Sequence, residues 1–222
     1  MKVLVSWSSG KDAAWMLHQL RSAHPGAVQG LLTTTNEAFD RVAMHGVPRD
    51  VLEAQAQAAG LPLHVVPLPW PCSNEEYERR IGAAVTGMVA AGFTHVAFGD
   101  LFLENVRHYR EDRLAGSGLA PLFPLWRRAS TGDLARQMID GGLKATLSTV
   151  DPRVLDAAFA GRAFDDALLA SLPAGVDPCG ENGEFHSCVW DGPMFAHPVP
   201  IAVHRTVVRD GFAFADLRLV GA

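Results

Sequence analysis

The sequence predicts an α/β protein: a Rossmann-like parallel sheet with helices on both faces, followed by a smaller C-terminal α+β domain. Short apolar runs alternate with helical patterns through the first half of the chain, which is typical of parallel sheets with crossover helices. Small and polar residues follow several of these runs, as at a ligand-binding edge. Beyond residue 126 the alternation gives way to a mixed pattern, so we predict two domains, residues 1–126 and residues 127–222.

The first domain is expected to begin with an apolar strand that leads into a helix. Ala13, Met16 and Leu20 recur at the spacing of one helical face. A later helix opens with the capping box Ser73-Asn74-Glu75-Glu76 after a proline-rich turn. In order along the chain, the predicted elements are a strand over 2–7, a helix over 12–22, a strand over 28–35, a polar loop from 36 to 45, a helix over 49–59, a strand over 63–68, a helix from 74 to Gly92 and a strand over 94–98.

The second domain follows a predicted connector. Residues 121–126 contain too much proline for a central strand, which indicates a rigid linking segment. Alternation over 204–220 around Asp210-Gly211 predicts a β-hairpin. The other expected elements are a helix over 131–141, a strand over 144–150, a helix capped by Asp151-Pro152 and a helix over 164–172.

Composition narrows the classes of protein. The chain has 222 residues, of which 48% are hydrophobic, and a net charge of −5, which disfavours a nucleic-acid partner. No run approaches about 20 apolar residues and no leading segment reads as an export signal. We therefore expect no membrane association and a cytoplasmic location. Cys72, Cys179 and Cys188 lack paired metal-ligand spacing, so we expect free thiols.

Polar residues follow three of the predicted strands, at ends that meet on one rim of a parallel sheet. They are Ser8 to Asp12, Thr33 to Asn36, and Gly99-Asp100. The first of these segments has the make-up of an anion site, because the first N–H groups of a helix and its dipole attract a phosphate. Lys11 adds a full positive charge there. An ordinary strand-to-helix turn is the alternative.

The other candidates each have a plainer reading. Asp100 is a candidate ligand of Mg²⁺ or a nucleotide, or else a helix cap. Glu104 and Arg107 belong to a charge-rich segment beside the rim, which predicts anion binding or a solvated, salt-bridged face. Glu181 and Glu184 stand in a loop rich in glycine and carboxylates, which is typical of a binding loop or of a plain surface loop.

Several blocks together resemble a known family. Ser8-Ser9-Gly10-Lys11-Asp12 is similar to the pyrophosphate loop (PP-loop) of the N-type ATP pyrophosphatases, a group with an adenine-nucleotide alpha-hydrolase-like fold. Residues 99–107, 118–126 and 177–186 resemble the diphthine-ammonia ligase family within that group. The blocks occur in the same order, and the resemblance spans nearly the whole chain.

The resemblance implies an amide-forming ligase that uses ATP and Mg²⁺. ATP is cleaved between its α and β phosphates, a substrate carboxylate becomes an acyl-adenylate, and ammonia displaces AMP. The acceptor of the family is diphthine on a translation elongation factor, but another carboxylate, on a protein side chain or a small molecule such as a corrinoid precursor, would suit the same site. The sequence shows no glutamine-hydrolysing domain and no N-terminal cysteine, so we expect free ammonia, or another amine, as nucleophile.

The resemblance also implies roles for individual residues. Those expected to bind the nucleotide are Ser8, Ser9, Gly10, Lys11, Asp12 and Gly99. Those expected to act in catalysis are Lys11, Asp12, Asp100 and Glu184, with Asp100 also binding the metal. Those expected to contact the acceptor are Glu104, Arg107, Glu181 and Glu184.

One departure from the family pattern affects the loop. Ala13 stands where the motif usually has serine. The missing hydroxyl would cost ~1.5–3 kcal/mol of binding to a charged phosphate, so we expect weakened nucleotide binding.

The sequence also allows two alternative functions. A non-catalytic or hydrolytic adenine-nucleotide-binding protein is supported by Ala13, whereas a PP-loop sulfur transferase acting on tRNA calls for a Cys-x-x-Cys pair or a basic RNA-binding domain, and the sequence shows neither. A homodimer is left open, with Trp70, Phe102 and Trp126 expected to be buried.

Overall fold

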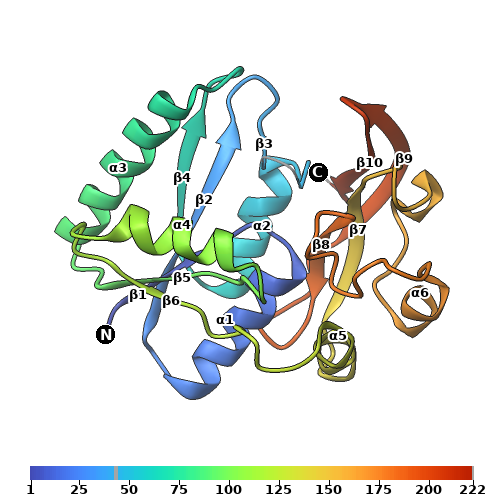
Figure 1. Cartoon of the computed structure of the whole chain (residues 1–222), viewed down its shortest axis with the longest axis horizontal. Coiled ribbons are helices and arrows are strands. Elements are labelled where there is room, and N and C mark those ends of the chain that lie inside the picture. Colours follow the sequence, from blue (N-terminus) through green and yellow to red (C-terminus); the bar gives the residue numbers. More distant parts are fainter. Residues whose placement is uncertain (43–44, 222) are drawn as a thin grey trace.

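Two sheets, each formed by one part of the chain, make up the structure (Figure 1). The computed structural model describes residues 1–42 and 45–221. The N-terminal part contains β1 (Val3–Ser6), α1 (Lys11–Ala23), β2 (Val28–Asn36), β3 (Arg41–Val42), α2 (Arg49–Ala59), β4 (Leu63–Leu68), α3 (Asn74–Ala90), β5 (His95–Ala97), α4 (Glu104–Leu114) and β6 (Ala120–Leu122). The C-terminal part contains α5 (Thr131–Asp140), β7 (Lys144–Val150), the 3-10 turn η1 (Ala157–Phe159), α6 (Asp166–Ser171), β8 (Phe185–Asp191), β9 (Ile201–Arg209) and β10 (Phe212–Leu219).

The N-terminal sheet is parallel apart from one short strand. β1 pairs in parallel with β2 on one side and with β5 on the other, β2 pairs with β4, and β5 pairs with β6. Successive strands therefore extend away from β1 in both directions, which makes the gap between the carboxyl ends of β1 and β5 a topological switch point. Ligands bind at such points in open α/β sheets.

Helices cover both faces of this sheet because the side chains of a strand alternate between its faces. Val3 and Val5 of β1 pack in one apolar cluster with residues of α1 and α2. Leu4 points the other way, into a second cluster with residues such as Val85 of α3 and Leu114 of α4. The predicted Rossmann-like class is confirmed.

The C-terminal sheet is antiparallel, in the order β8-β7-β10-β9. The hairpin of β9 and β10 turns at Asp210 and Gly211, whose φ angles of 51° and 81° are the left-handed conformations that a tight hairpin turn requires. The predicted hairpin and the α+β character of this part are therefore confirmed.

The two parts are joined by a common core and by backbone hydrogen bonds. One apolar cluster contains side chains from both, such as Leu17 of α1, Leu147 of β7 and Phe185 of β8. The N–H of Val189 in β8 donates to the carbonyl of Ser9 at 3.0 Å. In Figure 1, α1 and α2 lie between the two sheets, so the C-terminal sheet faces the loop that follows β1.

Several predicted elements were wrong. Residues 120–122, which overlap the expected connector, form strand β6, and the proline is accommodated because β6 is the last strand in the pairing order. The predicted polar loop contains β3, which pairs antiparallel with the end of β2. No α-helix follows Asp151: the N–H of Leu155 donates to the carbonyl of Asp151 at 3.0 Å, but this single turn is not continued, and the chain passes into η1.

The expected burial of the large aromatic residues was wrong for one of them. Trp70 is 60% exposed and packs edge-on against Phe39, with ring centroids 6.1 Å apart, whereas Phe102 and Trp126 are half-buried. Among the helices formed by residues 1–42 and 45–221, none combines the length and apolarity needed to cross a membrane.

Candidate active site

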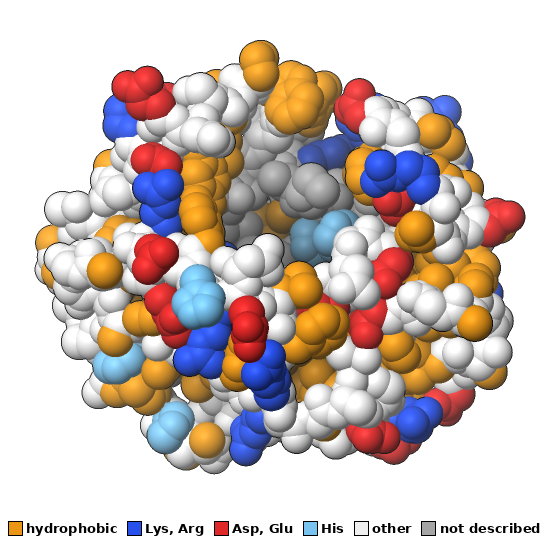
Figure 2. Space-filling view, viewed as in Figure 1, with side chains coloured by type: hydrophobic (Ala, Val, Ile, Leu, Met, Phe, Trp, Pro, Cys, Tyr) orange, Lys and Arg blue, Asp and Glu red, His pale blue; other side chains and the backbone are white. Residues whose placement is uncertain are grey.

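A pocket of about 260 Å³ lies at the junction of the two parts, at the carboxyl ends of β1 and β5. The space-filling view shows this face hollowed near its centre, with histidine atoms inside the hollow (Figure 2). The residues that line the pocket are Ser6, Ser8, Lys11, Asp12, Ala13, His45, Phe98, Gly99, Asp100, Arg110, Cys179, Gly180, Glu181, Gly183, Phe185, His186 and Ser187. Both parts of the chain therefore contribute to its wall.

The loop after β1 turns through a conformation that favours glycine. Ser9 is buried with a φ of 68°, and α1 then begins at Lys11 with Gly10 as its N-cap. The N–H of Lys11 donates to the hydroxyl oxygen of Ser187 at 3.1 Å. The N–H groups of the first helical turn are not used by carbonyls of the helix, so an anion at this end would meet hydrogen-bond donors and the positive end of the dipole.

Gly99, which follows β5, lies close to the start of α1. A Cβ atom on Gly99 would lie 3.0 Å from the carbonyl carbon of Asp12 and 3.1 Å from the nitrogen of Ala13. A side chain at this position would therefore push β5 and α1 apart. The small size of Gly99 therefore allows the chain after β5 to lie close to the start of α1.

Lys11 is a buried, fixed positive charge. Its side chain is 3% exposed, and Nζ donates to Asp12 Oδ1 at 2.9 Å and Oδ2 at 2.8 Å, and also to the carbonyl oxygen of Cys179. Burial alone would lower the pKa of Lys11, but the Asp12 carboxylate outweighs it and holds that pKa above its ordinary value. The ammonium group therefore stays charged at neutral pH.

Asp100 is held by a two-point ion pair that extends the pocket wall. Arg110 Nε lies 2.5 Å from Oδ2 and Nη2 lies 3.1 Å from Oδ1 of Asp100, and the guanidinium also lies over the ring of Phe98, 4.4 Å from its centroid. Such a fork fixes both the carboxylate and the cation in the plane that they share.

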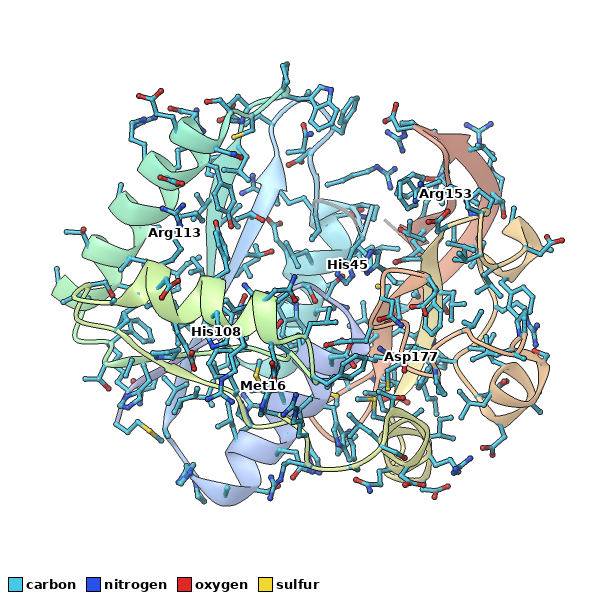
Figure 3. The ribbon with its side chains drawn as sticks, viewed as in Figure 1. Met16, His45, His108, Arg113, Arg153 and Asp177 are labelled. Atoms are coloured by element: carbon cyan, nitrogen blue, oxygen red, sulfur yellow. The ribbon has the colours of Figure 1, made fainter. Side chains whose placement is uncertain are left out.

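The loop from Asp177 to Glu184 is held by its own carboxylates. Glu184 is 6% exposed, and its oxygens accept from the N–H of Asp177 and from the N–H and side-chain amide of Asn182, each at 3.0 Å. Asp177 accepts from the N–H of Cys179 at 2.8 Å and from the Thr131 hydroxyl at 2.6 Å. Figure 3 shows Asp177 at the C-terminal part, near α5. These bonds fix the carbonyl of Cys179 against Lys11.

Glu181 projects from the same loop across the junction. Its Oε1 accepts from the N–H of Leu101, which follows β5, at 2.9 Å. Burial raises the pKa of Glu181 to about 7, and the negative charge of Asp12 adds to that rise. A carboxyl with this pKa can hold or release a proton at neutral pH.

Two histidine rings lie against each other in the pocket, inclined by 34°. The rings of His45 and His186 have centroids 4.5 Å apart, and a ring nitrogen of His45 lies 3.3 Å from the carbonyl oxygen of Ser187. Burial and nearby Lys11 lower the pKa of His186 to about 4, and burial together with His186 lowers that of His45 well below its ordinary value. Both rings are therefore neutral at pH 7. Figure 3 shows His45 between the two sheets.

The structure brings most of the predicted site residues together. Ser8, Lys11, Asp12, Gly99, Asp100 and Glu181 line the pocket, with Ser9 and Gly10 in the adjoining loop. Three predicted residues stand apart from the lining: Glu104 pairs with Arg127 at 2.5 Å, Arg107 with Glu111 at 2.8 Å, and Glu184 supports its loop.

Other lining residues were missed as site residues by sequence reasoning. Arg110 lies one helical turn beyond Arg107 and, unlike Arg107, reaches Asp100. The charge-rich sequence of this segment does not show which of its arginines faces the rim. His45 and Ser187 come from distant parts of the sequence and carry no local signal.

The pocket contains donors suited to Mg²⁺, although no ready-made cage is present. Among the described residues, no group of three or more His, Cys, Asp or Glu side chains is placed to hold a metal. Mg²⁺ typically takes one or two carboxylates and completes its shell with waters and phosphate oxygens. Asp12 and Asp100, with side chains 27% and 14% exposed on the pocket wall, fit that requirement.

Comparisons with known proteins match the two parts of the chain to two domains of one family, and nearly the whole chain to enzymes of one name. A family model described as the diphthamide synthase N-terminal domain matches residues 1–119, and one described as the C-terminal domain matches residues 130–216. The chain is 27% identical to a diphthine–ammonia ligase of Danio rerio, over 98% of this chain and 92% of that relative. It is 24% identical to the protein of that name in Homo sapiens, over 98% and 89%, and 25% to that in Rattus norvegicus, over 100% and 91%.

Proposed function

The chain belongs to the diphthamide synthase family, and we propose that it is an ATP-dependent amide-forming ligase that makes AMP and pyrophosphate. The observation that supports this best is the junction pocket, in which the start of α1 and the buried Lys11 face a loop carrying Glu181 from the other part of the chain. The start of α1 together with Lys11 suits a polyphosphate, and the loop that carries Glu181 suits an acceptor.

In the first step, a carboxylate oxygen of the acceptor attacks the α-phosphorus of ATP. The bond between the α-phosphorus and the bridging oxygen breaks, pyrophosphate leaves, and an acyl-adenylate forms. Negative charge grows on the departing pyrophosphate, and Lys11 together with the N–H groups of α1 would stabilise it. Asp12 would keep the Lys11 ammonium in place, as the 2.8 Å contact indicates.

In the second step, ammonia attacks the carbonyl carbon of the acyl-adenylate, and AMP leaves. The attacking nitrogen must lose a proton. Glu181 is our candidate acceptor of that proton, since its pKa of about 7 suits a general base at neutral pH. His45 and His186 are neutral and would accept or donate hydrogen bonds without adding charge to the pocket.

We also propose roles for the two parts of the chain, a metal site, an oligomeric state and a location. Residues 1–126 would bind the nucleotide and residues 127–222 the acceptor. Asp100 and Asp12 would hold Mg²⁺, which neutralises phosphate charge when it is bound. The exposed pair of Phe39 and Trp70 supports a homodimer, and the free thiols of the cysteines support a cytoplasmic location.

The acceptor is proposed to be a carboxylate, and the relatives' name makes diphthine the first compound to test. The protein is incubated with ATP, Mg²⁺, ammonium and acceptor whose carboxylate carries ¹⁸O. We expect AMP and pyrophosphate, an amide product, and one ¹⁸O atom in AMP. ADP and phosphate as products would contradict the proposal, and so would AMP without ¹⁸O.

A further inference from the structure

Gln55 is a fully buried amide beside the phosphate loop, and it does not line the pocket. It lies on α2, is 0% exposed, and belongs to the buried part of that helix together with Leu52 and Ala56. A polar side chain in such a place is costly unless all of its hydrogen bonds are made. The hydrogen bonds of Gln55 therefore explain why a polar side chain is found at this buried position.

The carboxamide of Gln55 makes four hydrogen bonds, to the loop after β1 and to β8. Nε2 donates to the carbonyl of Val189 in β8 at 2.6 Å, to the carbonyl of Ser9 at 3.2 Å and to Sγ of Cys188 at 3.6 Å. Oε1 accepts from the indole N–H of Trp7 at 3.1 Å. The two carbonyls can only accept and the indole can only donate, so these partners also fix which end of the amide is nitrogen.

These partners hold the loop at the points that set its direction. Trp7 and Ser9 flank Ser8, and Ser9 has the left-handed φ of 68°. The Ser9 carbonyl accepts from Gln55 and from the N–H of Val189, so its peptide plane is held from two sides. That plane precedes Gly10 and the first N–H groups of α1, and a rotation of it would turn those donors away from the pocket.

We propose that Gln55 is a positioning residue for nucleotide binding: its amide holds the phosphate loop in its binding conformation and ties that conformation to β8 of the C-terminal sheet. This inference rests on the proposed function. Gln55 acts through Trp7, Ser9 and Val189 and does not touch the nucleotide itself. The sequence carries no signal for this role, because Gln55 lies 46 residues from Ser9 and 134 from Val189.

The first test uses Gln55→Met, which keeps the side-chain length and removes every hydrogen bond. Gln57→Met is the matched control, because Gln57 lies two residues further on the same helix and is exposed. We expect the Kd for ATP to rise about tenfold in the first variant and to stay unchanged in the second. Thermal unfolding gives the folded fraction of each variant, and each Kd is calculated from the concentration of folded protein.

The second test separates positioning from a general loss of stability. In Gln55→Glu, a carboxylate would face the carbonyls of Ser9 and Val189, whereas a protonated carboxyl can donate to one of them. Burial favours the protonated form, so the ratio of the variant Kd to the wild-type Kd should fall as pH is lowered from about 8 to about 6. The same ratio for Gln57→Glu should stay flat.

The outcomes distinguish this inference from the proposed function. If the wild-type protein neither binds nor cleaves ATP, the proposed function fails. If wild-type binds ATP, and Gln55→Met melts earlier but retains the wild-type Kd, then Gln55 is only a core residue and the inference is overturned. A pH-independent ratio for Gln55→Glu would overturn it as well.

Discussion

Arg110 holds Asp100 at two points, with Nε 2.5 Å from Oδ2 and Nη2 3.1 Å from Oδ1, although the two residues lie ten positions apart. The pair closes one wall of the pocket at the end of β5. The carboxylate is thus oriented before any ligand arrives, and its negative charge is partly balanced. A ligand that needs Asp100 would meet it in a fixed position.

The role proposed for Asp100 predicts a loss of metal-dependent turnover. Asp100→Asn keeps the shape of the side chain and removes its charge, so Mg²⁺ would lose one anionic ligand. We expect the Mg²⁺ concentration for half-maximal AMP formation to rise about tenfold or more, as measured by metal titration at saturating ATP. Asp112→Asn, on the exposed side of α4, is the control and should match wild-type. Equal metal dependence in the three proteins would count against Asp100 as a ligand.

Replacing Lys11 should weaken nucleotide binding strongly. Lys11→Met removes the buried ammonium group, and charge-assisted hydrogen bonds of this kind correspond to about 10- to 150-fold in Kd. Calorimetric titration with ATP measures the change. Lys144→Met is a suitable control, since Lys144 is exposed and pairs with Asp191 away from the pocket. An unchanged Kd for Lys11→Met would exclude Lys11 from the phosphate site.

Restoring the hydroxyl that the family motif usually has should improve binding. Ala13 lines the pocket in the first turn of α1 and is 4% exposed. In Ala13→Ser the new hydroxyl can reach a phosphate oxygen, and we expect the Kd for ATP to fall by about tenfold. Ala83→Ser, on the exposed side of α3, should leave it unchanged. A weaker affinity in Ala13→Ser would mean that position 13 does not face the phosphates.

The raised pKa of Glu181 predicts how stability depends on pH. The pKa of Glu181 rises from its ordinary 4.5 to about 7 on folding, so between these values the folded state keeps a proton that the unfolded state has lost. Stability that comes from this group is present at low pH and falls as pH rises through about 7.

Glu181→Gln removes this titration while leaving an oxygen to accept from the N–H of Leu101. The Tm of the variant minus the Tm of wild-type should therefore be about 2–4 °C larger at about pH 8 than at about pH 5. The change is modest because the side chain of Glu181 is only half-buried. Glu75→Gln, on the surface, should show a constant difference. A difference that shrinks with pH would reverse the assigned direction.

The fold was largely predictable because its signals are local. Each buried strand of the parallel sheet is a short apolar run, and the turns between elements contain residues with clear preferences, such as Asp210-Gly211. Predictions were wrong where a tertiary contact overrode the local preference. Residues 120–122 pair with β5 despite their proline, and the N–H of Asp151 donates to the carbonyl of Glu184 at 2.9 Å, where the sequence predicted a helix start.

The candidate site was predictable where its residues share one loop or follow the ends of neighbouring parallel strands, as Gly99 and Asp100 do. Ser8 to Asp12 form one loop, and their residue types alone indicate an anion site. His45 meets Ser187 across 142 residues, and this pairing follows from the packing of β8 against the loop rather than from any motif. The sequence could name Glu184 as part of a binding loop, but it could not reveal that its oxygens point into the loop itself.

Glu184 is predicted to support its loop without taking part in nucleotide binding. Glutamine at position 184 has one acceptor oxygen where the carboxylate has two, so an N–H group of the loop would lose its partner. We expect Glu184→Gln to cost ~2 kcal/mol, seen as a Tm lower by about 4–8 °C. Because the loop faces the acceptor side of the pocket, the KM for the acceptor should rise about tenfold, while the Kd for ATP stays within about twofold of wild-type. Asp177→Asn should behave similarly, since Asp177 holds the same loop through Cys179 and Thr131. If Glu184→Gln instead abolished ATP binding at a temperature where it is folded, the proposed division between nucleotide and acceptor residues would be wrong.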